Sequence, residues 1–120
     1  MRFRQNSLRL RVNRREAENL SSGFALREYV HFPGDTQLDY VLESVPSVVP
    51  QAEFTAGTIR VAIPREQVQK WAQTDTIGMY FDLPANGGLL RIAVEKDLEC
   101  VDGPPSERDP DAFPRSGKNC

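Results

Sequence analysis

The strongest constraint on the fold is an internal repeat. At an offset of 51 residues, residues 1–33 match residues 52–84 without a gap, and one additional residue extends the match through Glu43 and Glu95. The two halves share few identical residues, but they share the order of apolar alternation, helix start and proline turn. Self-similarity of this kind indicates a duplicated supersecondary unit.

Each half is predicted to contain strand, strand, helix, strand and strand in that order. In the first half, Leu8, Leu10 and Val12 alternate with arginines, which is typical of a strand with one buried face. Asn13, followed three residues later by Glu16, forms the pattern of a helix capping box. The first helix is therefore expected to start directly after this strand.

The second half carries stronger turn signals. Pro64 suits the first turn of a helix, because its missing N–H would be unpaired there in any residue. Val68 and Trp71 follow at helical spacing. Asn86-Gly87 favours a tight hairpin between the last two strands.

This pattern predicts an α+β domain over residues 1–97, built from pseudo-repeats 1–45 and 52–97. A single unit would leave its sheet edges open. We therefore expect the strand-strand-helix-strand-strand units to form a curved antiparallel sheet or small barrel with two helices. Prolines and glycines break the pattern after it, so residues 98–120 are expected to form an irregular C-terminal tail docked on the domain.

Opposite charges gather at the two ends of the chain, whose net charge is −2. Residues 1–15 carry six arginines and no acid, whereas residues 95–111 carry seven acids and two bases. A basic stripe favours a phosphate or nucleic-acid partner. The acidic segment offers it an internal partner instead, which disfavours nucleic acid. If the stripe binds an external anion, the candidate ligands are Arg9, Arg11 and Arg60.

Three carboxylates, Glu95, Asp97 and Glu99, alternate along the last predicted strand and so share one face. Such a face could hold a hard cation. It could equally form ion pairs with Arg9 and Arg11 across a strand pair, and we favour this second interpretation because the arginines are available.

Metal binding has few candidate ligands. Cys100 and Cys120 lack the C-x-x-C spacing of zinc sites, although with His31 they could form one if the tail folds back. Two ordinary thiols are the favoured interpretation, with a disulfide or redox thiol as the alternative. No cofactor is predicted, and the absence of a nucleophile elbow or a phosphate-binding loop disfavours an enzyme.

The aromatic residues fall into two groups. Those on apolar faces are expected in the core rather than on a base-stacking surface: Trp71, Phe3, Phe24, Phe54 and Tyr80. Phe113, followed by Pro114 in a polar tail, does not belong to any strand-like or helix-like pattern of apolar residues. We expect Phe113 and Pro114 to anchor the tail on the domain or to dock on a partner.

Two segments resemble a small bacterial family whose function is unassigned. They are the opening NSLRLR of residues 6–11 and the tail, with EKDLEC at 95–100 and DPDAFP at 109–114. The resemblance implies a stand-alone cytosolic bacterial protein and supplies no activity.

The sequence therefore favours a small, non-catalytic cytoplasmic binding or accessory module. The alternatives are an anion- or phosphate-binding protein or enzyme and a zinc-stabilised domain. No apolar run approaches the ~20 residues that a bilayer span requires, so a membrane-spanning helix is excluded. We expect a monomer or weak dimer, with an unidentified protein as a candidate partner.

Overall fold

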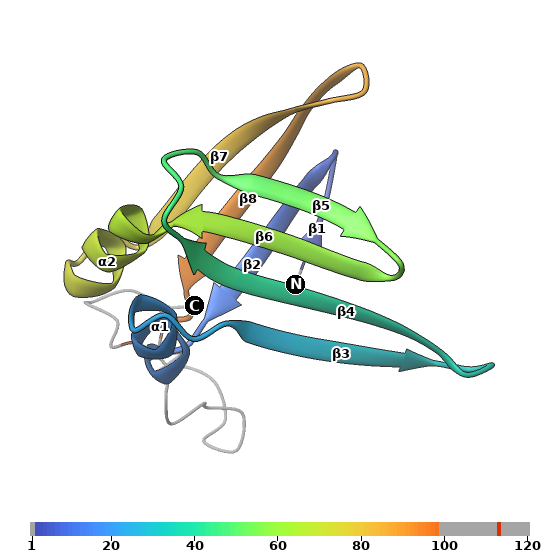
Figure 1. Cartoon of the computed structure of the whole chain (residues 1–120), viewed down its shortest axis with the longest axis horizontal. Helices are drawn as coiled ribbons and strands as arrows, with labels where there is room; N and C mark the ends of the chain where they lie inside the picture. The colour runs from blue at the N-terminus through green and yellow to red at the C-terminus, as the bar shows by residue number, and fades with distance from the viewer. Residues whose placement is uncertain (1, 99–112, 114–120) are drawn as a thin grey trace. The chain divides into compact units, whose positions relative to one another are not determined.

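A computed structural model describes residues 2–98 and residue 113 (Figure 1). Its elements follow the order β1-β2-α1-β3-β4-β5-β6-α2-β7-β8, which is strand-strand-helix-strand-strand twice over. The chain divides into two compact units. Unit 1 combines Met1–Ala17 with the chain from Ile77 onward, and unit 2 comprises Glu18–Thr76.

Unit 1 contains a four-stranded sheet in the order β1-β2-β8-β7. Its strands are β1 (Arg2–Phe3), β2 (Ser7–Val12), β7 (Gly78–Ala85) and β8 (Gly88–Lys96). The β1–β2 and β7–β8 hairpins are antiparallel, and the central β2–β8 pair is parallel. One face of the sheet carries the buried side chains Leu10, Val12, Met79, Ile92 and Val94.

Unit 2 contains a sheet of the same topology, in the order β3-β4-β6-β5. Its strands are β3 (Leu26–Phe32), β4 (Thr36–Val45), β5 (Gln51–Thr55) and β6 (Thr58–Pro64). The central β4–β6 pair is parallel, and β6 lies between β4 and β5 (Figure 1). Helix α2 (Arg65–Gln73) packs on β4 and β6 and buries Val68 and Trp71.

The expectation of one antiparallel sheet or a small barrel is therefore wrong. The described residues form two open mixed sheets, each with a parallel pair at its centre. Turn chemistry predicts which consecutive strands form a hairpin, because it is local. It does not predict which hairpins pair with each other, and here each sheet joins a hairpin from the first half of the chain to one from the second.

Both helices begin close to where the sequence places them. Helix α1 (Arg14–Ser21) starts with the predicted capping box, since the Asn13 N–H donates to Glu16 Oε1 at 2.9 Å and the Glu16 N–H donates to Asn13 Oδ1 at 2.9 Å. Pro64 ends β6 and directly precedes α2, one position before the expected first turn. Neither described helix is long and apolar enough to cross a membrane.

The two sheets also share a strand register. Arg9 of β2 pairs with Ala93 of β8, and Arg60 of β6 pairs with Val41 of β4. Adding 51 to the β2 residue and subtracting 52 from the β8 residue converts every β2–β8 pair into a β4–β6 pair. The β1–β2 and β5–β6 hairpins agree at an offset of 51, whereas the β3–β4 and β7–β8 hairpins are shifted by two residues.

Candidate functional site

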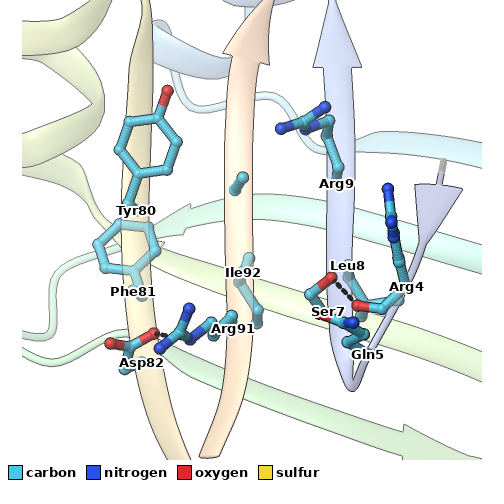
Figure 2. A pocket seen from close by; sticks show the side chains of 11 residues that line it. Arg4, Gln5, Ser7, Leu8, Arg9, Tyr80, Phe81, Asp82, Arg91 and Ile92 are labelled. Atoms are coloured by element: carbon cyan, nitrogen blue, oxygen red, sulfur yellow. Dashed lines mark hydrogen bonds and ion pairs between the residues drawn. The ribbon is translucent and has the colours of Figure 1, made fainter.

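A hollow of about 800 Å³ lies on the sheet of unit 1 (Figure 2). This volume is within the range of small-molecule sites. Residues from β2, β7, β8 and the β1–β2 turn line it. Among the lining residues, the charged and hydroxyl-bearing side chains are Arg4, Ser7, Arg9, Tyr80, Asp82 and Arg91.

The β1–β2 turn positions Arg4 at the hollow. Gln5 and Asn6 have φ values of 50° and 60°, and two successive left-handed residues are typical of the tightest hairpin turns. The Asn6 side chain donates to the Leu89 carbonyl at 2.8 Å, which ties the turn to the start of β8. The exposed Arg4 side chain forms no ion pair with any other described residue.

Strand register and side-chain alternation bring Arg9 and Arg91 to the same face of the sheet. Ser7 pairs with Arg91, which pairs with Asp82 across β8 and β7. Figure 2 shows the Arg91 side chain reaching toward Asp82, with Nε 3.7 Å from Oδ1. These side chains are 72% and 55% exposed, so water screens the ion pair and it contributes little stability.

A chain of contacts crosses the middle of this face from β2 to β7. Arg9 Nε lies 2.9 Å from Glu95 Oε1, and the Tyr80 hydroxyl donates to Glu95 Oε2 at 2.8 Å. The hydrogen bond to Glu95 raises the pKa of Tyr80, as do partial burial and the negative charge of Glu95, while the positive charge of Arg9 opposes this effect. Glu95 therefore orients both a guanidinium and a phenol.

The three predicted anion ligands have different surroundings. Arg9 lines the hollow, and Arg11 lies two residues further along β2 and is exposed. Arg60 belongs to unit 2, where it forms ion pairs with Glu43 and, at 3.2 Å, with Glu53. The two carboxylates raise the pKa of Arg60, with the hydrogen bond to Glu43 the largest cause. Two carboxylates thus already compensate the charge of Arg60.

The predicted carboxylate face is described only in part. Glu95 contacts Arg9, which is the cross-strand pairing that the alternation allows. The Asp97 main chain is engaged on both sides, since its N–H donates to the Val12 carbonyl and its carbonyl accepts from the Phe113 N–H, both at 2.8 Å. Glu99 lies outside the described residues.

The predicted metal ligands are not assembled in the part of the chain that is described. His31 is exposed on β3, where it pairs with Gln37 of β4. Cys100 and Cys120 lie outside the described residues. Within residues 2–98 and 113, no group of three or more His, Cys, Asp or Glu side chains could hold a metal ion.

Phe113 contacts the end of the unit 1 sheet. It forms a parallel bridge with Leu98, and its ring centre lies 5.2 Å from the Nζ atom of Lys96. Lys96 is only 8% exposed, so this cation–π contact occurs where water is largely excluded. Pro114, the second predicted anchor residue, lies outside the described residues.

The prediction of an aromatic core is right for Trp71 and wrong for three other residues. Phe24, Phe54 and Tyr80 are each about two thirds exposed. Alternation identifies residues that share a face, but it does not show whether another element covers that face. The sequence prediction also missed Arg4 and Arg91, because only the pairing of β2 with β8 brings them together.

Comparison with known proteins adds a family assignment. The model of a family of unknown function, DUF7009, matches residues 1–117. The chain belongs to DUF7009. This match confirms the resemblance to a family without an assigned function. No curated protein and no solved structure matches this DUF7009 chain. Its function therefore has to be argued from the site itself.

Proposed function

We propose that the protein is a small, non-catalytic cytoplasmic binding module, and that the hollow of unit 1 binds an oxyanion such as a phosphate group. The observation that carries this proposal is that Arg4, Arg9 and Arg91 line one hollow, and that Asp82 supplies the single carboxylate among its described lining residues. Guanidinium groups match phosphate geometry, because they donate two parallel hydrogen bonds.

The state of each arginine supports anion binding. Arg4 has no ion-pair partner among the described residues, so an anion would meet an uncompensated charge. The exposed contact of Arg91 with Asp82 is long, and exchanging it for a ligand would cost little. Arg9 is oriented by Glu95, which reduces the entropy lost when a ligand binds.

The contacts of Glu95 support a role in binding rather than catalysis. Both of its carboxylate oxygens already have partners, Arg9 and the Tyr80 hydroxyl, whereas a general base needs a carboxylate free to accept a proton from a bound substrate. The sequence contains no nucleophile motif that would supply an alternative.

Calorimetric titration with pyrophosphate at low ionic strength tests this proposal. We expect binding to weaken about tenfold in Arg4→Ala and in Arg91→Ala, since each loses one charge-assisted hydrogen bond. Arg27→Ala removes an exposed arginine from β3 of unit 2 and serves as the matched control, with unchanged affinity. An absence of binding, or an equal loss in the control, contradicts the proposal.

We also propose that the two halves, 1–45 and 52–97, arose by internal duplication. Its support is the shared register of β2–β8 and β4–β6, with the same offsets that align the sequence. The two-residue shift in the outer hairpins means that Tyr80 corresponds to Arg27, whereas the gapless sequence match aligns Tyr80 with Tyr29. The contact between Phe113 and Lys96 likewise supports docking of the tail, residues 98–120.

A further inference from the structure

Tyr80 has an unusual position for an exposed aromatic residue. Its side chain is 64% exposed, yet its phenol end lies directly over the backbone of the same strand. A Cβ atom on Gly78 would lie 2.5 Å from the Tyr80 hydroxyl oxygen and 2.6 Å from Cζ. Only the absence of a side chain at residue 78 lets the ring occupy this place.

The plane of the Tyr80 ring lies roughly parallel to the sheet. Figure 2 views the sheet of β2, β7 and β8 face-on, and the Tyr80 ring is also seen face-on. The hydrogen bond from its hydroxyl to Glu95, which is itself paired with Arg9, holds the ring in this orientation. One aromatic face is thereby presented outward, and its orientation is set before any ligand arrives.

An outward aromatic face beside guanidinium groups suits a ligand that combines a planar ring with phosphate. Stacking on an aromatic side chain holds a nucleobase without requiring base-specific hydrogen bonds. Tyr80 and the three arginines line the same hollow, so one molecule could meet both. Building on the proposed anion site, we infer that the ligand is a free nucleotide, whose base stacks on Tyr80 and whose phosphates contact Arg4 and Arg91.

A free nucleotide fits this face better than a nucleic-acid strand. Asp82 and Glu95 interrupt the positive charge of the face, and the whole chain has a net charge of −2. A nucleic-acid strand carries a phosphate on every nucleotide, so it requires a continuous basic surface along its path. A mononucleotide carries its negative charge only on its phosphate groups, and these can contact the arginines without lying beside the carboxylates.

The test compares adenosine diphosphate with pyrophosphate by calorimetry in metal-free buffer. Because the two probes carry similar phosphate groups, their difference isolates the contribution of the nucleoside. We expect the nucleotide to bind about tenfold tighter or more, which is within the range measured for base–aromatic stacking. Tyr80→Leu should remove this advantage without changing pyrophosphate affinity, and Tyr80→Phe, which keeps the ring, should retain most of it.

Gly78→Ala is an independent second variant, because its methyl group displaces the Tyr80 ring without altering an arginine. It should weaken nucleotide binding and leave pyrophosphate binding intact, which also shows that the variant is folded. Equal affinity of the wild-type protein for the two probes overturns the nucleotide inference while leaving the anion site standing. Failure of both probes to bind overturns both proposals. An oligonucleotide of ten nucleotides that binds a hundredfold tighter than the mononucleotide overturns the inference that the ligand is a free nucleotide.

Discussion

At the scale of single residues, Glu95 organises the exposed face of unit 1. Its two carboxylate oxygens have different partners, one in Arg9 and the other in the Tyr80 hydroxyl. One side chain therefore sets the direction of a charged group on β2 and of an aromatic group on β7. Removing the Glu95 carboxylate should leave the side chains of Arg9 and Tyr80 free to change orientation.

The pKa of Tyr80 reports directly on this contact. The hydrogen bond favours the neutral phenol and raises its pKa above the ordinary value of about 10. Its contribution to stability is complete below the pKa of an unfolded tyrosine and is lost as the pH rises through the higher folded value. We expect Glu95→Ala to lower the pKa of Tyr80, measured by NMR of ¹³C-labelled tyrosine.

Asp82→Ala provides the matched control for this titration. Asp82 is another carboxylate of the same face, and its partner is Arg91, whereas the Tyr80 hydroxyl donates to Glu95. Its removal should leave the titration of Tyr80 unchanged. A similar shift in both variants would mean that the general charge of the face, and not the hydrogen bond, controls the phenol.

Individual residues could be predicted from the sequence only where their partners follow from alternation. The pairing of Glu95 with an arginine of β2 is of this kind, because both residues lie on the polar side of an alternating strand. The exposure of Tyr80 could not be predicted, since it depends on the missing side chain of Gly78 and on what covers the sheet.

At the scale of elements, local chemistry determines where helices and hairpins begin. The capping box of α1 satisfies two backbone N–H groups, those of Asn13 and Glu16. We expect Asn13→Ala to lower the free energy of unfolding by about 1 kcal/mol, measured by urea denaturation. Asn19→Ala, an exposed change on the same helix, should leave stability unchanged or slightly higher.

The elements themselves were largely predictable, and their assembly was not. The β2 strand, the turn at Asn86-Gly87 and the start of α1 agree with the sequence prediction, because each depends on neighbouring residues. The central parallel pairs join residues far apart in the chain, such as Leu10 with Val94. No local signal specifies such a pair, and the sequence therefore does not predict the hollow on the face formed by β2, β8 and β7.

At the scale of the whole molecule, each sheet depends on both halves of the chain. Sheet β1-β2-β8-β7 pairs the first hairpin with the last, and sheet β3-β4-β6-β5 pairs the two middle hairpins. The connector between the halves, residues 46–50, takes part in neither sheet, and its Val48 is 92% exposed.

Cutting this connector should therefore leave the protein assembled. We expect a chain cleaved at a protease site inserted at residues 46–50 to elute from a size-exclusion column as one species of the intact size. The β2–β8 and β4–β6 pairs still join the two pieces. Concentrated urea should separate them, whereas separation in native buffer would contradict the strand pairing described here.

The exchange of hairpins between halves has a consequence for how folding depends on concentration. A peptide of residues 1–45 would contain two hairpins, β1–β2 and β3–β4. It would lack β8 and β6, the strands that pair with the inner edges of these hairpins. It could complete these sheets only by trading hairpins with another molecule, so its folding would be second order and would fail on dilution. Five connecting residues turn that encounter into an intramolecular one, which makes the fold independent of how much protein is present.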